Sequence, residues 1–272
     1  KLFIDSKPYS FDVEGNFSWG KNIYTFIEKG NIISKTLWIK DGYTIEKIFN
    51  NNDQFDSFYS DVRRNIILAM KANNIEFDES KFELRNYHKL VNNDELHNKV
   101  INITRNLTEQ DFSLDLKKLL HISEEILSSK LSLKVKELNR VHLQIRINRP
   151  NSLDINPPHK DGYLSYWKNI INIWIPIEGC NMATSLPIIP GSHLWSENQI
   201  FKTTNKGSII NGNKYMVPCI LKLRDRDLEM IRPDPLEGEA IFFTPFLIHG
   251  AAFNNSNNTR IAMELRFPKF GY

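Results

Sequence analysis

Residues 157–166 read Pro-Pro-His-Lys-Asp-Gly-Tyr-Leu-Ser-Tyr, and this stretch decides which fold the sequence predicts. His159 and Asp161 stand two positions apart within it. On an extended backbone, side chains two positions apart point to the same side, so this imidazole and this carboxylate can hold one cation together. The best candidate for a third ligand is His249, which follows the apolar run Phe-Leu-Ile. Two histidines and one carboxylate form the facial triad of non-haem Fe(II) oxygenases, which leaves positions open for a cosubstrate and oxygen.

A histidine and an aspartate two positions apart are a weak signal alone, because such pairs arise by chance and usually lie in a surface loop. A second feature strengthens the signal. Arg260 follows His249 by eleven residues (260 − 249), in a segment whose alternation predicts a strand. Its planar guanidinium matches a carboxylate, such as the one at the distal end of 2-oxoglutarate. The alternative for Arg260 is an ordinary ion pair at the end of a strand.

Further motifs follow one another in a fixed order along the second half of the chain. They are His159-x-Asp161, Trp174-Ile-Pro, Pro190-Gly-Ser-His193, Gly238-Glu-Ala-Ile-Phe-Phe, His249-Gly and Arg260. Together they resemble the phytanoyl-CoA hydroxylase-like (PhyH) family of Fe(II)/2-oxoglutarate-dependent dioxygenases. The resemblance implies a mainly β protein with flanking helices (α+β) and a double-stranded β-helix core, also called a jelly-roll or cupin-like core. It does not name the substrate, because one fold hosts many chemistries.

The same resemblance implies roles for several residues. Fe(II) would be held by His159, Asp161 and His249, and 2-oxoglutarate would bind this iron while Arg260 anchors its far carboxylate. Trp174 and Asn172 share one face of the segment 170–176 and would lie beside the cosubstrate, although a packed core indole is the alternative for Trp174. With O2, the cosubstrate would yield succinate and CO2.

A polar strand face supplies the next candidates. In residues 141–148 apolar and polar residues alternate, as in a strand with one polar face. If that face points into the site, Arg146 is a candidate for cosubstrate binding, and Gln144 and Asn148 are candidates for substrate binding. A solvent-facing strand is an equally good interpretation.

The loop after the metal motif is aromatic and basic. Tyr163 and Trp167 lie there with Lys160 and Lys168, so they are candidates to stack on a flat or sugar-like substrate and to attract an anionic one. The polar segment 195–227 is expected to cover the mouth of the site, as long insertions often do.

Helical spacing of apolar residues predicts helices over 55–70 and in the region 114–127. Residues 75–107 are polar, and their His88 and His97 have no partner at ligand spacing, so solvent-facing or capping roles are expected for both. We expect one domain over residues 1–272, with N-terminal strands and supporting helices in 1–134 and the jelly-roll core with its metal site in 135–272.

Composition limits the remaining choices. Of the 272 residues 41% are hydrophobic and 25% charged, which is ordinary for a globular protein, and a net charge of +3 without a basic patch argues against nucleic acid. Cys180 and Cys219 form no metal-binding motif, and no apolar stretch reaches the ~20 residues of a membrane span. We therefore expect a cytoplasmic protein without a membrane partner. The sequence predicts no oligomeric state.

The predicted function is hydroxylation of a C–H bond in a small polar metabolite, such as a sugar or a biosynthetic natural-product intermediate. Two alternatives stay open. A cupin-like epimerase or isomerase would share the barrel and its inward histidines but would not need the arginine. A catalytically silent, sugar-binding jelly-roll would keep the fold alone.

Overall fold

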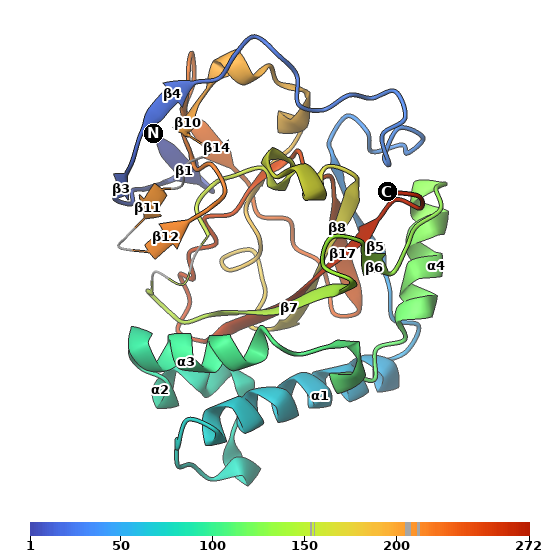
Figure 1. Cartoon of the computed structure of the whole chain (residues 1–272). Coiled ribbons are helices and arrows are strands. Elements are labelled where there is room, and N and C mark those ends of the chain that lie inside the picture. The colour runs from blue at the N-terminus through green and yellow to red at the C-terminus, as the bar shows by residue number, and fades with distance from the viewer. Residues whose placement is uncertain (153, 155, 205–207, 211–212) are drawn as a thin grey trace.

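The structure is a computed structural model that describes residues 1–152, 154, 156–204, 208–210 and 213–272. It is mainly β, and its helices lie to one side of the strands (Figure 1). Among the described residues, no helix is both long and apolar enough to cross a bilayer.

The largest sheet has the strand order β5-β15-β8-β17-β7-β6, and neighbouring strands run antiparallel. In chain order its strands are β5 (Tyr43–Lys47), β6 (Lys134–Val135), β7 (Arg140–Asn148), β8 (Ile170–Glu178), β15 (Glu239–Phe243) and β17 (Arg260–Pro268). The two long central strands are buried along almost their whole length. Both faces of this sheet are therefore covered.

The two faces differ in chemistry because side chains alternate along each strand. One face is apolar and packs in the main core, for example through Ile145, Ile173 and Met263. The other face is polar where β7 and β17 pair. There Arg260 stands opposite Asn148, and Glu264 stands opposite Gln144.

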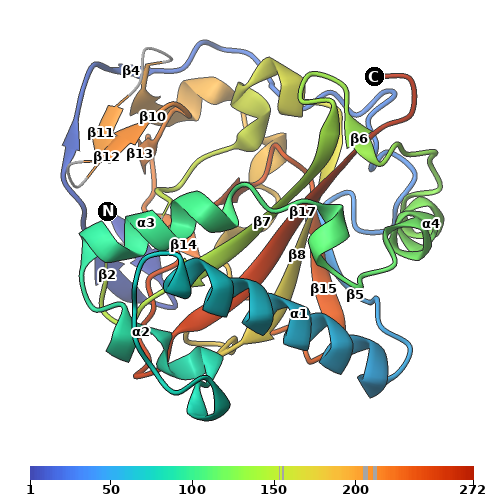
Figure 2. The ribbon, with the colours of Figure 1, turned by 60° about the horizontal axis from the view of Figure 1, so that its bottom comes forward.

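Helices pack against the apolar core. The helices are α1 (Asn52–Lys71), α2 (Tyr87–Leu90), α3 (Asp94–Thr104) and α4 (Leu116–Leu127). One of them, α3, also borders the polar face. Figure 2 shows α1 lying across the strands of the large sheet. The apolar stripe predicted over 55–70 lies in α1, where Phe58, Val62 and Ile66 are fully buried. The region predicted around 114–127 forms α4, whereas α3 was not predicted.

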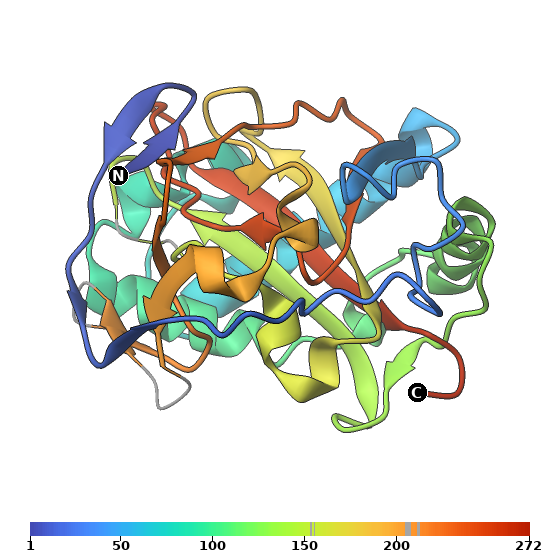
Figure 3. The same cartoon turned by 90° about the horizontal axis from the view of Figure 1, so that it is seen from above.

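Shorter strands face the polar side of the large sheet (Figure 3). They form small sheets of order β14-β1-β2, β13-β10-β4, β12-β11-β3 and β16-β9. Their bounds are β1 (Leu2–Ile4), β2 (Lys7–Tyr9), β3 (Val13–Glu14), β4 (Phe17–Trp19), β9 (Ile188–Ile189), β10 (Ile200–Thr203), β11 (Ser208–Ile210), β12 (Asn213–Tyr215), β13 (Ile220–Leu223), β14 (Leu228–Met230) and β16 (Ile248–His249). Strands β3 and β4 thus pair with strands of the segment 195–227, which was expected to cover the site.

One glycine allows two distant segments to meet. His159 and His249 exchange backbone hydrogen bonds of 2.9 and 3.1 Å. Next to them Gly250 has a φ of +114°, and a Cβ there would lie 2.5 Å from the carbonyl oxygen of Pro157. A side chain at position 250 would therefore be strained and would push these segments apart.

Candidate active site

The three predicted metal ligands meet in the structure. Ligand atoms of His159, Asp161 and His249 all lie within 4.8 Å of one another, and the three side chains are buried. His159 Nε2 is 3.4 Å from Asp161 Oδ1, and His249 Nε2 is 3.6 Å from Asp161 Oδ2. Among the described residues, this is the cluster of histidine, cysteine and acidic groups that is compact enough for a metal ion.

Backbone contacts orient both histidine rings and select their tautomer. His159 Nδ1 lies 2.6 Å from the Pro157 carbonyl oxygen, and His249 Nδ1 lies 2.9 Å from the Leu247 carbonyl oxygen. A carbonyl only accepts, so each Nδ1 carries a proton and donates it, and in a neutral imidazole this places the lone pair on Nε2. Burial, together with the neighbouring His159, lowers the pKa of His249 to about 4. A neutral imidazole is the form that binds a metal.

Two side chains fix the orientation of the Asp161 carboxylate by hydrogen bonds. Its Oδ2 accepts hydrogen bonds from Asn172 Nδ2 at 2.9 Å and from Arg266 Nη2 at 3.0 Å. Burial opposes ionisation of Asp161, but the charge of Arg266 holds its pKa well below its usual range. The backbone at Lys160 is extended, as predicted, and Asp161 then begins the 3₁₀ turn η4 (Asp161–Tyr163). A charged, oriented carboxylate therefore faces the two histidines.

The donor set fits iron. Two imidazole nitrogens and one carboxylate oxygen on one side of a site are the ligands typical of non-haem Fe(II) oxygenases. The triad borders a cavity of about 510 Å³. This volume is within the usual range for small-molecule sites, ~300–1,000 Å³. Both histidines line this cavity.

Arg260 lines the same cavity. Its side chain is only 2% exposed, and its Nε has no hydrogen-bond partner among the described residues. Its guanidinium lies 5.5 Å from the ring centroid of Trp174. Burial lowers the pKa of Arg260 to about 10, which shows how poorly its charge is compensated. A buried, unpaired guanidinium is suited to bind a carboxylate such as that of 2-oxoglutarate.

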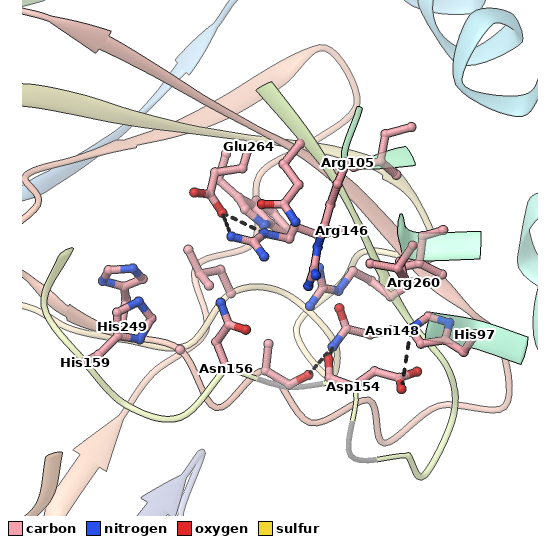
Figure 4. A pocket seen from close by; sticks show the side chains of 18 of the residues that line it. His97, Arg105, Arg146, Asn148, Asp154, Asn156, His159, His249, Arg260 and Glu264 are labelled. Carbon is pink, nitrogen blue, oxygen red and sulfur yellow. Dashed lines mark hydrogen bonds and ion pairs between the residues drawn. The ribbon is translucent and has the colours of Figure 1, made fainter. Parts of the chain in front are cut away.

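Several other predicted residues also reach the cavity. Gln144, Arg146 and Asn148 line it from β7, and Trp174 lines it from β8. Figure 4 shows Arg146 and Asn148 among the lining side chains. Arg146 forms an ion pair with Glu264 of β17, in which its Nη2 lies 2.7 Å from Oε2. The polar face of β7 thus points inward rather than toward solvent. The binding roles of these residues remain predictions.

Asn172 is not in the cavity wall. Its Nδ2 donates to Asp161, while its Oδ1 accepts from Arg266 Nε at 2.9 Å. The sequence predicted that Asn172 lies beside the cosubstrate; in the structure it contacts the carboxylate of Asp161. It shares its strand face with Trp174 but precedes it by two positions, opposite Arg266 of β17.

The structure does not bring Tyr163 and Trp167 into the cavity either. Their loop folds inward as η4 and η5 (Ser165–Trp167). The Tyr163 hydroxyl donates to Glu197 Oε2 at 2.9 Å, and the Trp167 ring is 5% exposed beneath the guanidinium of Arg266, which is 4.4 Å away. The partners that draw the two rings inward are 34 or more residues away, so the local sequence does not reveal them.

Sequence reasoning missed one wall of the site, which is α3. Its cavity-lining residues recur at helical spacing: Asp94, His97, Asn98, Ile101, Asn102 and Arg105, the last at its C-terminal cap. His97 is buried and contacts the Tyr87 hydroxyl, so its expected solvent-facing or capping role was wrong. The signal was available in a polar stripe at positions i, i+3, i+4, i+7, i+8 and i+11 after the capping residue Asn93.

The Asn172→Ala variant should bind Fe(II) ~10–100-fold more weakly, since the groups that orient a metal ligand typically contribute this much affinity. Anaerobic competition with a chromophoric chelator measures this change. Asn148→Ala is the matched control, because the Asn148 amide donates to the Ala252 carbonyl and does not contact Asp161. Equal iron affinity in both variants would show that Asn172 does not position Asp161.

Several solved structures share the fold of this chain. Similar folds occur in EvdO2 from Micromonospora carbonacea var. aurantiaca (13% identity, 85% of this chain and 87% of that chain, TM-score 0.51) and in EvdMO1 (14%, 86% and 49%, TM-score 0.52). The epimerase SnoN in complex with Fe3+, alpha ketoglutarate and nogalamycin RO is also similar (12%, 85% and 80%, TM-score 0.50). At these identities the likeness concerns the fold alone.

Sequence comparison adds the family. No curated protein sequence matches the chain. The sequence profile of the family described as phytanoyl-CoA dioxygenase (PhyH) matches residues 38–262, a span that contains the triad and Arg260. The chain therefore belongs to the phytanoyl-CoA dioxygenase (PhyH) family, as its motifs predicted.

Proposed function

We propose that this protein is a dioxygenase that hydroxylates a C–H bond of a small polar metabolite, such as a sugar or a natural-product intermediate. One observation carries the proposal: a buried His-Asp-His triad and a buried, unpaired arginine face the same cavity. The cofactors are Fe(II) and the cosubstrate 2-oxoglutarate, in keeping with the family. When bound, they supply with O2 the oxidant for an unactivated C–H bond and yield succinate and CO2.

The chain's own residues have distinct tasks in this proposal. His159, Asp161 and His249 hold the metal on one side, so that its other side is open to the cavity. Arg260 binds the far carboxylate of 2-oxoglutarate by charge-assisted hydrogen bonds, and Trp174 packs beside its guanidinium. Burial of these groups excludes water, which strengthens each electrostatic contact.

Arg146 is held by Glu264, so we propose that it orients the cosubstrate or substrate through its remaining donors. Gln144 and Asn148 offer amide groups on the same strand face, which suits hydroxyl or carbonyl groups of a polar substrate. We do not assign substrate contact to Tyr163 and Trp167, because other partners occupy them.

We further propose that the fold is a double-stranded β-helix. The six-stranded sheet would form one side and the small sheets opposite its polar face the other, with the triad between them. Support comes from the β16-β9 pair and the backbone bridge between His159 and His249, which join the two sides next to the metal ligands.

The test is succinate formation. Protein loaded anaerobically with Fe(II) is given 2-oxoglutarate, O2 and a panel of polar metabolites, and succinate and products are measured by mass spectrometry. Hydroxylation predicts succinate together with a product that has gained one oxygen atom. The His159→Ala variant is the control and should form neither.

The same assay separates the alternatives. An epimerase such as SnoN would return a product of unchanged mass and inverted configuration. A silent binding protein would bind a metabolite without binding 2-oxoglutarate. Absence of 2-oxoglutarate binding by the iron-loaded protein would remove the dioxygenase proposal.

A further inference from the structure

The cavity wall carries more positive charge than its own acidic groups neutralise. Its basic side chains are Arg105, Arg146, Lys214, Arg260 and Arg266. Its acidic side chains are Asp94, Asp154 and Glu264. Wall charge of one sign concentrates ligands of the opposite sign inside a cleft.

Each acidic group of the wall already has a cationic partner. Asp94 and Asp154 both bind Arg149, and Asp154 does so at 2.8 Å. Glu264 binds Arg146 at 2.7 Å and also binds Arg266. These carboxylates are therefore not available to neutralise further cations.

Three cations of the wall remain without an acidic partner among the described residues: Arg105, Lys214 and Arg260. The sequence outside the described ranges contains no aspartate or glutamate, so no carboxylate there can supply one. Arg260 is accounted for by the carboxylate of 2-oxoglutarate. Arg105 and Lys214 are not explained by the cosubstrate.

Arg105 and Lys214 come from elements that lie outside the large sheet. Arg105 caps the C-terminus of α3, whose polar stripe faces the cavity, and Lys214 is in the middle of β12. Figure 4 shows the side chain of Arg105 extending from α3 toward those of Arg146 and Arg260. Partial burial and the nearby charge of Arg146 lower the pKa of Arg105, so like charges face each other here. A bound anion would relieve this repulsion.

We infer that the substrate carries an oxyanion group, a carboxylate or a phosphate, which Arg105 and Lys214 bind on the side of the cavity formed by α3 and β12. This inference rests on the proposed function, because it assigns Arg260 to the cosubstrate. The inference narrows the proposed class of substrate from polar metabolites to acidic ones. Neighbouring amides of Asn98 and Asn102 offer hydrogen bonds to the rest of such a molecule.

The test uses two small probes, inorganic phosphate and acetate. Protein loaded anaerobically with Fe(II) and saturated with 2-oxoglutarate is titrated with each probe by calorimetry, so that Arg260 is already occupied. We expect at least one probe to bind, and we expect the Arg105→Gln/Lys214→Gln double variant to bind it about tenfold or more weakly, since each charge-assisted hydrogen bond contributes substantially. Binding of phosphate alone indicates a phosphorylated substrate, and binding of acetate indicates a carboxylate.

A matched control is Lys99→Gln, because Lys99 is also on α3 but forms an ion pair with Glu95 and does not line the cavity. It should leave probe binding unchanged. Both substituted residues of the double variant are exposed, so its far-ultraviolet dichroism should match that of the unaltered protein.

The outcomes separate the two proposals. If 2-oxoglutarate binds but neither probe does, or if the double variant binds the probes as tightly as the unaltered protein, the oxyanion site is overturned while the dioxygenase stands. If a probe binds through Arg105 and Lys214 but 2-oxoglutarate does not bind, the dioxygenase falls and the oxyanion site stands.

Discussion

The His249→Ala variant is expected to bind Fe(II) more than about 100-fold more weakly than the unaltered protein, and to form no succinate above background. Loss of an outer partner of a metal ligand already costs ~10–100-fold in affinity, so loss of a ligand costs more. His249 and His159 are the two proposed nitrogen donors, and their rings lie 4.3 Å apart between centroids. Without His249, a single imidazole and Asp161 remain.

His193→Ala is the control for this prediction. His193 is also a fully buried histidine, it follows Pro190-Gly-Ser, and its Nε2 lies 2.8 Å from the Ile39 carbonyl oxygen. Removing its ring should lower stability, as removing His249 does, while iron binding stays intact. Calorimetric titration of Fe(II) under argon, with urea unfolding in parallel, measures both quantities. Iron affinity retained by His249→Ala would exclude this histidine from the metal centre.

The metal centre could be predicted because each ligand lies in a short local pattern. His159 and Asp161 are separated by one extended residue, and strand alternation then fixes their common direction. His249 and Arg260 lie where apolar strands begin or end, and such strands are recognisable without tertiary information. Their convergence in space was supplied by the family resemblance and not by the residues alone.

Other parts of the site depend on contacts that no local pattern shows. Asn172 was expected beside the cosubstrate, but Arg266, 94 residues later, aligns it with Asp161. Tyr163 was expected to meet substrate, but Glu197 binds its hydroxyl and also the buried ammonium of Lys160 at 2.9 Å. A buried charge needs a partner. Because Glu197 is the partner of the buried Lys160, the aromatic loop that carries Lys160 and Tyr163 folds inward.

Helix α3 was missed for a different reason. Hydrophobic periodicity was used to find helices, whereas the cavity-facing stripe of α3 is mostly polar. A polar stripe is usually assigned to solvent, and only the position of α3 beside β7 turns it toward the site. Helices that border polar cavities are therefore underpredicted by apolar patterns.

The Arg260→Met variant should bind 2-oxoglutarate at least ~30-fold more weakly, because truncating one partner of a buried charge pair costs about 2–5 kcal/mol. The same variant should unfold at a urea concentration no lower than the unaltered protein when ligand is absent. Arg260 is buried, no acidic partner is described for it, and burial depresses its pKa to about 10. An apolar side chain of similar length removes that uncompensated charge.

The combination of effects distinguishes an anchor from a structural residue. Replacing a residue that only supports the fold would lower the stability of the protein. In Arg260→Met, by contrast, we expect only the stabilisation by 2-oxoglutarate to be lost. At 100 times its Kd, 2-oxoglutarate should raise the free energy of unfolding of the iron-loaded protein by about 2.7 kcal/mol and that of Arg260→Met by far less. Arg260→Lys keeps the charge but lacks the planar guanidinium, so 2-oxoglutarate should stabilise it by an intermediate amount. Arg140→Met, at the exposed start of β7, should respond like the unaltered protein. If Arg260→Met is destabilised yet binds 2-oxoglutarate normally, the cosubstrate is anchored elsewhere and Arg260 only supports the core.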